Sequence, residues 1–441
     1  MPFTKILRLG LIHVAVAITL VPINSTLNRI MISELGLAAT LVAALVSLPY
    51  LFSPIQVWIG GYSDRHPLLG FRRTPYILLG LLLCAGGAAL APTAAFMLAA
   101  GFGAQGGHAG GALPGVVVAL AAFGAWGMGF NFATVSYLSL ATDLAGEEHR
   151  ARTVGVMWFM LIVSVIVTAI LAGRALRPYS VAALYRVFYV TSGAALALGL
   201  LGLLGLERRG AAARTGERQS FAQLLRLVGG NAQARLFFVY LVVLLIALLG
   251  QDLLLEPYAA DVFGVPVNRT TEYTGIWGIA LLLALLLAGP LARRVGKTRA
   301  AAIGGGVAAT GLLLIALSGI LGLRSLLLVA LVIFGFGSGL STATNLALML
   351  DMTLAGQVGA FIGAWGMADA LARLVGTLLS GVVRDSVKAL TGNATAAYVT
   401  VFLIEALALG VSLLLLRRIS VARFHEREVP GVVELAGYVD A

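Results

Sequence analysis

Long apolar stretches recur along almost the whole chain, and they constrain its fold more than any other feature. A helix needs about 20 apolar residues to cross the hydrocarbon core of a bilayer. Stretches of that length, separated by charged or Gly/Pro-rich segments, lie at residues 9–29, 40–61, 75–99, 114–140, 153–173, 182–205, 235–256, 273–292, 300–320, 325–349, 357–382 and 396–416. The pattern predicts an all-α membrane protein with twelve transmembrane helices.

Composition excludes a soluble enzyme. Hydrophobic residues make up 60% of the chain and charged residues only 11%, whereas about a quarter of the residues in soluble domains are charged. The net charge of +11 would suit either nucleic acid or a membrane surface. The positions of the charges, between the apolar stretches, favour the membrane. We therefore expect the lipid bilayer as a partner and no nucleic acid.

The basic residues indicate the orientation in the membrane. An even number of spans places both termini on one side. With the N-terminus inside, 21 of the 30 Lys and Arg residues fall on inner segments and 8 on outer segments. Cytoplasmic segments are enriched in Lys and Arg, so both termini are predicted to be cytoplasmic. The first apolar stretch ends without a small-residue cleavage site, and we interpret it as a span rather than a signal peptide.

An internal repeat divides the chain. Asp143 recurs 208 residues later as Asp351, with glycines at matching distances before and after both. The longest polar stretch falls between the sixth and seventh predicted spans. We therefore predict two pseudo-symmetric six-helix halves, residues 1–206 and 235–418. A cytoplasmic linker, residues 207–234, joins them, and residues 419–441 form a cytoplasmic tail.

The loop after the second span of each half is rich in glycine and basic residues. Two such halves resemble the major facilitator superfamily, whose loop motif is Gly-x-x-x-Asp-Arg-x-Gly-Arg-Arg. The first loop follows this motif with a longer spacing, and the second has Arg293 in place of the acid. Glycine allows close helix approach, and an acid can pair with a neighbouring helix end and its arginines. The alternative is a positively charged anchor without a conformational role. The residues that we assign to these conformational loops are Gly60, Asp64, Arg65, Arg72, Arg73, Asp143, Gly289, Arg294 and Asp351.

Within that superfamily, several segments resemble the bacteriochlorophyll-delivery group of light-harvesting assembly proteins, the PucC and LhaA type. The segments are TLNRIMISEL at 26–35, RRTPYI at 72–77, LATDLA at 140–145 and GAWGMADALAR at 363–373. The resemblance implies the major facilitator fold and a role in (bacterio)chlorophyll delivery or handover and in antenna assembly. It also implies antenna subunits and pigment-synthesis machinery as partners, in a cytoplasmic (inner) or intracytoplasmic photosynthetic membrane. The residues establish no cofactor, and the resemblance implies (bacterio)chlorophyll as a bound pigment.

Inserting one ionisable residue into the centre of the membrane costs about 2.5–3.5 kcal/mol on insertion scales. A residue kept there at that cost is a candidate site residue. Asp369 and Arg373 share a helix face at i and i+4 and can form a charge-assisted pair. The pair either lines the bundle and meets a polar ligand or only fixes the helix register. Glu405 lies in the middle of the last predicted span, and its partner cannot be named from the sequence.

Two further groups of polar residues lie in predicted spans. Asn24 and Asn28 share a face near the end of the first span, beside Arg29. This polar corner faces either a central cavity or the outer interface, and ordinary interfacial anchoring is the alternative. In the seventh span Asp252 and Glu256 again lie at i and i+4. Two carboxylates on one face can hold a shared proton, so proton coupling is one hypothesis, and location at the outer end with an arginine partner is the other.

Histidine often provides the axial ligand of a chlorophyll magnesium. His13 is the one histidine of five within a predicted span, and it is a candidate pigment ligand near the start of that span. The sequence contains no phosphate-binding Gly-x-x-x-x-Gly-Lys pattern, no Cys/His metal cluster and no nucleophile elbow. We expect no enzyme activity and no metal site. Two alternatives remain open, namely a proton-coupled exporter of amphipathic small molecules and a membrane scaffold without transport.

Overall fold

The computed structural model describes residues 2–102, 109–207, 209, 226, 228–353 and 358–425. Most of the predicted linker and residues 426–441 of the predicted tail lie outside this part. The described elements are α1 (Phe3–Val21), η1 (Pro22–Leu27), η2 (Ile30–Glu34), α2 (Ala39–Val46), α3 (Leu48–Leu51), α4 (Ile55–Arg65), α5 (Thr74–Phe102), α6 (Ala109–Ala175), α7 (Val181–Leu203), α9 (Ala232–Leu249), η3 (Gly250–Leu253), α10 (Leu255–Phe263), α11 (Val267–Val295), α12 (Lys297–Leu321), α13 (Arg324–Asp351), α14 (Val358–Thr391), α15 (Ala394–Leu416) and α16 (Val421–His425).

Eleven helical stretches of the described chain are long and apolar enough to cross a membrane. They correspond to eleven of the twelve predicted spans. One of them is the first, in which α1 continues through the π-helical turns η1 and η2. Two others lie within α6, which divides at Gly146, where the backbone leaves the helical region. The all-helical fold class is therefore confirmed.

The second predicted span, at 40–61, is not one continuous helix. It is divided into α2, α3 and α4, none of which is long enough to cross a membrane alone. Pro49 lies in the first turn of α3, and Pro54 directly precedes α4. Proline lacks a backbone N–H and clashes with the preceding turn, so the helix restarts at each of these residues. The expectation of twelve continuous transmembrane helices is corrected to this extent.

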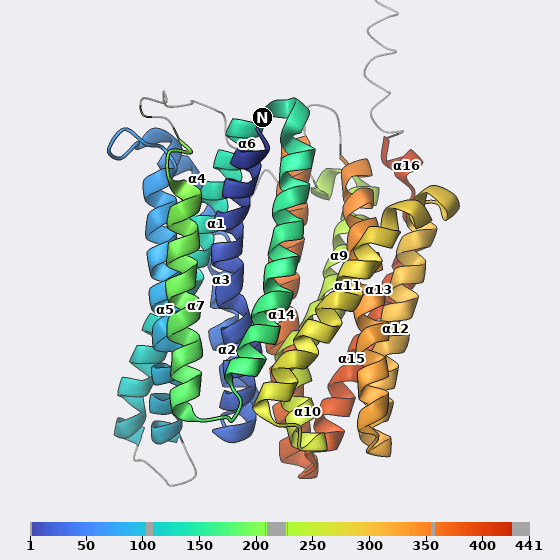
Figure 1. The fold of residues 1–441 in the computed structure, drawn as a ribbon. Helices are drawn as coiled ribbons and strands as arrows, with labels where there is room; N and C mark the ends of the chain where they lie inside the picture. The colour runs from blue at the N-terminus through green and yellow to red at the C-terminus, as the bar shows by residue number, and fades with distance from the viewer. Residues whose placement is uncertain are drawn as a thin grey trace, which may run out of the picture.

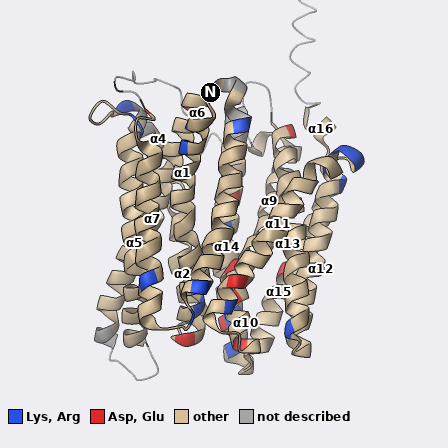
Figure 2. Cartoon of the chain, in the orientation of Figure 1, with Lys and Arg blue, Asp and Glu red and all other residues tan. Residues whose placement is uncertain are grey.

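The long helices form one bundle with both described ends on the same side (Figure 1). The start of α1 and the short α16 lie there, and we call it the terminal side; α10 lies on the opposite side, the far side (Figure 1). Charged residues are sparse along most of the helices (Figure 2), as the cost of charge in a bilayer requires.

The packing of the helices brings the two predicted halves together. In the first, α5 packs on α6 and α7; in the second, α12 packs on α13 and α15. Between them, α11 contacts α6, and α14 contacts α2 and α3. The most buried large side chains include Trp126, Tyr137, Tyr258 and Trp365. The core thus consists of helix faces that meet inside the bundle, while other apolar faces are left exposed, as contact with lipid requires.

Candidate functional site

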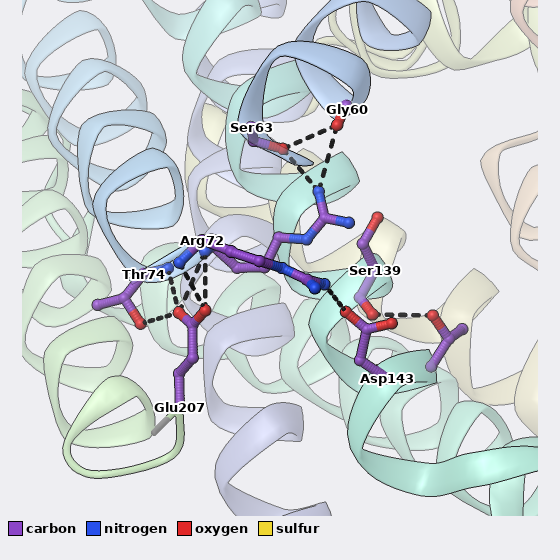
Figure 3. A network of polar contacts seen from close by, with 9 residues as sticks. Gly60, Ser63, Arg72, Thr74, Ser139, Asp143 and Glu207 are labelled. Carbon is purple, nitrogen blue, oxygen red and sulfur yellow. Dashed lines mark hydrogen bonds and ion pairs between the residues drawn. The ribbon is translucent and has the colours of Figure 1, made fainter. Parts of the chain in front are cut away.

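The loop between α4 and α5 is tied to two neighbouring helices (Figure 3). Arg72 forms an ion pair of 2.8 Å with Asp143 of α6. Arg73 donates hydrogen bonds to the Ser63 hydroxyl at 2.6 Å and to the Gly60 carbonyl at 3.4 Å, both in α4. Four predicted loop residues, namely Gly60, Arg72, Arg73 and Asp143, therefore belong to one network on the terminal side. Their conformational role stays a prediction.

Glu207, just after α7, completes this network (Figure 3). Its carboxylate accepts hydrogen bonds from the backbone N–H groups of Arg72, Arg73 and Thr74, between 2.7 and 3.1 Å, and from the Thr74 hydroxyl. These groups lie at the start of α5, where an acid satisfies free N–H groups and is favoured by the helix dipole. The carboxylate thus caps a helix that lies far from it in the sequence.

The corresponding loop of the second half contains a simpler contact. Lys297 Nζ lies 2.6 and 2.7 Å from the two carboxylate oxygens of Asp351, and His425 Nε2 lies 3.0 Å from the Asp351 carbonyl oxygen. Asp351 therefore pairs with Lys297, and Arg294 is exposed at the end of α11.

Of the remaining predicted loop residues, Gly289 departs from expectation, Arg65 lies at the surface, and Asp64 can be described only in part. Close helix approach does not explain Gly289, because no atom lies within 4 Å of the position that its Cβ would occupy. Arg65 is exposed, although it has an interaction partner. Asp64 lies in α4, but its side chain is outside the described part of the structure.

The polar corner of the first span packs on the second half at the far side. Asn28 Nδ2 donates to the Leu253 carbonyl at 2.6 Å and to the Asn24 carbonyl at 3.2 Å. Arg29 forms an ion pair of 2.8 Å with Glu34 and donates to a carbonyl of the α10–α11 connection. Asn28 and Arg29 are almost completely buried. The corner therefore faces the contact between the predicted halves, and simple anchoring at the membrane interface does not describe it.

Hydroxyl groups join the same helices around Glu256. Ser25 Oγ of η1 and Thr274 Oγ1 of α11 both donate to Glu256 Oε1. Beside them, the hydroxyls of Thr26 and Thr271 lie 3.1 Å apart. Glu256 is buried, and its Oε2 has no hydrogen-bond partner in the described structure. The Ser25–Glu256 and Thr26–Thr271 contacts would have to break if the two halves separated at the far side.

Asp385 near the end of α14 adds another contact between the halves. Its carboxylate accepts from the backbone N–H groups of Ala39 and Thr40 at the start of α2, at 3.1 and 2.8 Å. Arg384 pairs with Asp385 at 2.9 Å and with Asp261 of α10 at 3.3 Å. We refer to the Glu256, Thr26–Thr271, Asn28 and Asp385 interactions as the far-side contacts.

The predicted Asp369–Arg373 pair forms on α14. Arg373 Nε donates to Asp369 Oδ2 at 3.0 Å, and its guanidinium carbon lies 5.5 Å from the ring centre of Tyr50 in α3. Arg373 also interacts electrostatically with Asp252 of η3. We call these four residues the central cluster. They come from three elements of both predicted halves.

The central cluster is open to solvent although protein surrounds it. The side chains of Arg373 and Asp369 are 31% and 45% exposed, although α14, the helix that carries them, packs on α3 and η3. Exposed surface on an enclosed group faces an internal space. The cluster therefore fits the bundle-lining interpretation of the Asp369–Arg373 pair, and its role in ligand binding stays a prediction.

The expectation that Asp252 and Glu256 share one face is wrong. Asp252 lies in the 3₁₀ segment η3 and joins the central cluster, whereas Glu256 lies in the first turn of α10 and joins the far-side contacts. The i and i+4 rule assumes continuous α-helix, and η3 changes the winding between them. In the described structure neither carboxylate interacts with the other, so the shared-proton hypothesis loses its geometric basis.

Glu405 of α15 is buried beside the break in the seventh span. Ser380 Oγ donates to Glu405 Oε1 at 3.0 Å, and Oε2 has no hydrogen-bond partner in the described structure. A Cβ on Gly250, the first residue of η3, would lie 2.7 Å from Glu405 Oε1. The hydrogen-bond partner of this carboxylate is thus Ser380, and a side chain at position 250 would force the Glu405 carboxylate to shift.

His13 is not open to a ligand in this conformation. It is 4% exposed, with the rings of Tyr137 and Trp158 centred 5.1 and 5.6 Å from its own. Its Nδ1 has no hydrogen-bond partner in the described structure. A pigment would have to displace Trp158 to reach the imidazole, so ligation by His13 stays a prediction without a preformed site.

Comparison with known families shows to which family the chain belongs. The family model described as PUCC protein matches residues 26–424. The chain belongs to this family. The matched region runs from the polar corner in η1 to α16, so it contains the central cluster, the far-side contacts and both terminal-side loops.

Relatives in the PucC family are similar over most of their length. Protein PucC of Rhodobacter capsulatus is 32% identical over 93% of this chain and 91% of its own. Protein PucC of Rhodovulum sulfidophilum is 34% identical over 88% and 86%. A protein named "Bacteriochlorophyll synthase 44.5 kDa chain" of Rhodobacter capsulatus is 29% identical over 97% and 98%.

Solved structures with the same fold are transporters. A bacterial homologue of the iron transporter ferroportin in an inward-facing state has a TM-score of 0.72 at 13% identity, over 95% of this chain and 99% of that chain. A bacterial homologue of the human lysosomal transporter Spinster in an inward-facing, unoccupied conformation has a TM-score of 0.69 at 12% identity, over 96% of both chains. The resemblance to the major facilitator superfamily is thereby confirmed at the level of fold.

Sequence reasoning about this PucC-family chain missed three residues. Tyr50 gave no signal because an aromatic residue in a span is usually a packing residue. Glu207 and Asp385 are acids at span ends, which are normally interpreted as charges at the membrane surface. Each instead caps a helix that becomes its neighbour only after folding.

Proposed function

We propose that the protein delivers or hands over bacteriochlorophyll and supports the assembly of light-harvesting complexes. The observation that carries this proposal is the central cluster, a solvent-accessible group of charges inside an apolar helix bundle. Membership of the PUCC protein family supplies the expected ligand class. A pigment with a polar edge and a long apolar chain matches such a space, because mostly apolar walls with a few placed polar groups are typical of ligand sites.

Arg373 is the group that we expect to meet the polar edge of the pigment. Its Nε is engaged by Asp369, which orients the guanidinium and leaves its outer N–H donors directed elsewhere. Arginine donates five N–H groups in a fixed fork, and these can bind ketone or ester carbonyl oxygens. Asp369 and Tyr50 then act as positioning residues for the guanidinium.

The proposal extends to the setting of the protein. We place it in the cytoplasmic or intracytoplasmic photosynthetic membrane, with both termini in the cytoplasm, and expect antenna subunits and pigment-synthesis machinery as partners. The predicted halves, 1–206 and 235–418, would rock about the central cluster, as halves of such transporters do, and the terminal-side loops would stabilise one arrangement. The protein would not be an enzyme.

The first experiment is purification of the full chain in mild detergent from its phototrophic host. An absorption spectrum, pigment extraction and identification of co-purifying proteins should find stoichiometric bacteriochlorophyll together with antenna polypeptides. Colourless protein without antenna polypeptides would contradict delivery and favour export.

A second experiment tests the central cluster in the host. Arg373→Leu should reduce antenna absorption at an unchanged amount of the protein, and Arg373→Lys should restore part of it because it returns the charge without the fork. Arg269→Leu is the matched control, since Arg269 is an exposed far-side residue. Full antenna assembly with Arg373→Leu would exclude this site.

The second candidate function is proton-coupled export of amphipathic molecules. The observation in its favour is Asp252, a carboxylate in the central cluster. Asp252→Asn should then abolish pH-dependent flux in vesicles and leave antenna assembly intact. A scaffold without transport predicts normal antenna assembly in both Asp252→Asn and Arg373→Leu variants.

A further inference from the structure

Asp252 has an unusual position in the seventh span. It is the one exposed residue in the otherwise buried stretch 251–259. Tyr50, Arg373 and Glu405, which belong to α3, α14 and α15, all interact with it electrostatically. Because η3 also packs against α9, α14, α15 and η1, the exposed surface of Asp252 faces the interior of the bundle.

The charges around Asp252 do not balance. The central cluster holds two carboxylates, of Asp252 and Asp369, but one guanidinium. Arg373 is hydrogen-bonded to Asp369, and the hydrogen bond that Asp252 accepts comes from the neutral amide of Gln251. The other polar atom of that amide, Gln251 Oε1, is buried without a hydrogen-bond partner in the described structure. The cluster therefore directs one surplus anionic oxygen into the internal space.

One face of α14 beside the cluster is uncovered. Gly366 lies two helical turns from Arg373 on the same face of α14. It is exposed, and no atom lies within 4 Å of the position that its Cβ would occupy. His13, the other candidate ligand for a pigment metal, is covered by Trp158. Asp252 and Asp369 are thus the accessible carboxylates of the central cluster, and in the described structure Asp252 is the one to which Arg373 forms no hydrogen bond.

We propose that Asp252 provides the axial oxygen ligand to the magnesium ion of a tetrapyrrole in this internal space. Four ring nitrogens hold such a magnesium in the ring plane, and an additional ligand binds perpendicular to that plane. Magnesium prefers hard oxygen donors, carboxylates above all. A carboxylate oxygen would displace only a water molecule from this position, and the partial positive charge on the magnesium would attract it although the ring and its metal are neutral together. The inference rests on the proposed pigment function and deepens it by naming the coordinating atom group.

The test compares a magnesium pigment with its metal-free counterpart. Purified full-length protein in detergent is titrated with bacteriochlorophyll and with bacteriopheophytin, which lacks the magnesium. Asp252→Asn removes the negative charge of the donor oxygen and should weaken binding of bacteriochlorophyll about tenfold, as loss of the partners of a metal ligand does, and leave binding of bacteriopheophytin unchanged. Asp252→His should restore bacteriochlorophyll binding because imidazole is also an axial ligand. Glu272→Gln is the matched control: it is also a carboxylate-to-amide change, but Glu272 pairs with the exposed Arg177 and Arg269, outside the central cluster and the terminal-side loops, and this variant should bind like the unaltered protein.

The outcomes separate this inference from the function on which it rests. Equal losses of both pigments in Asp252→Asn, or no loss of either, would overturn coordination by Asp252 while pigment binding itself stands. If the unaltered protein binds neither pigment, the proposed pigment function fails. Thermal unfolding and size-exclusion profiles of each variant show whether the fold is intact, and Asp252→His tests coordination even if Asp252→Asn is unstable.

Discussion

The Glu207 carboxylate lies 2.7 Å from both the backbone nitrogen and the hydroxyl oxygen of Thr74. The first residue is at the end of the sixth span and the second at the start of the third, so a single acid fixes the relative position of two helices. The same acid is where the predicted linker begins. This contact therefore holds the start of the linker against the first-half loop, beside the Arg72–Asp143 pair.

Removal of this cap should loosen the start of α5. Glu207→Ala leaves the backbone N–H groups of Arg72, Arg73 and Thr74 without their acceptor and should cost about 0.5–2 kcal/mol. Hydrogen exchange measured by mass spectrometry should accelerate at 72–76. Glu207→Gln retains one acceptor oxygen and should have a smaller effect. Unchanged exchange in Glu207→Ala would show that the cap does not hold this loop.

The two terminal-side acids should differ in their contribution to stability. The Arg72 side chain is 8% exposed in its pair with Asp143, whereas the Lys297 side chain is 43% exposed in its pair with Asp351. Exposed pairs contribute about 0–1 kcal/mol, and removing one partner of a buried pair costs about 3–5 kcal/mol. Asp143→Asn should therefore lower the Tm in detergent clearly more than Asp351→Asn. Equal shifts would contradict the difference in burial.

A disulfide should form across the far-side contacts. The hydroxyl oxygens of Thr26 and Thr271 lie 3.1 Å apart, so Thr26→Cys with Thr271→Cys should place two sulfur atoms within bonding reach. Mild oxidation should give a cross-linked peptide that mass spectrometry detects, and neither single variant should give it. If pigment handover requires the far side to open, the cross-linked protein should fail to support antenna assembly until it is reduced. Absence of the cross-link would contradict this packing of η1 on α11.

Two glycines should respond in opposite ways to alanine. A Cβ on Gly250 would lie 2.7 Å from Glu405 Oε1 and 2.9 Å from Ser380 Oγ, so Gly250→Ala should destabilise the protein by about 1–3 kcal/mol through overpacking. Gly366→Ala meets no atom within 4 Å and should be neutral or slightly stabilising, because alanine favours helix. Thermal unfolding in one detergent compares them. A loss of stability in Gly366→Ala equal to that in Gly250→Ala would be inconsistent with this geometry.

The sequence alone determined the parts of this protein that depend on short-range patterns. The lengths of the apolar stretches predicted eleven of the membrane-length helices. This works because each span must be apolar and long enough to cross the bilayer, whatever the other spans do. The Asp369–Arg373 pair was predictable for a similar reason, since both residues lie on one regular helix. The prolines that divide the second span are present in the sequence. Hydropathy alone did not predict the breaks, because it takes no account of the backbone N–H that each proline lacks.

Tertiary structure decided which polar groups meet. Thr74 and Glu207 are 133 residues apart, and Ser25 reaches Glu256 across the two predicted halves. Such contacts depend on which faces of separate helices turn toward each other, and apolar composition, which is similar around many of these helices, does not specify that rotation. The 3₁₀ segment η3 also decides which polar groups meet, within a single span. By changing the winding over four residues, it directs Asp252 toward the central cluster and Glu256 toward the far-side contacts.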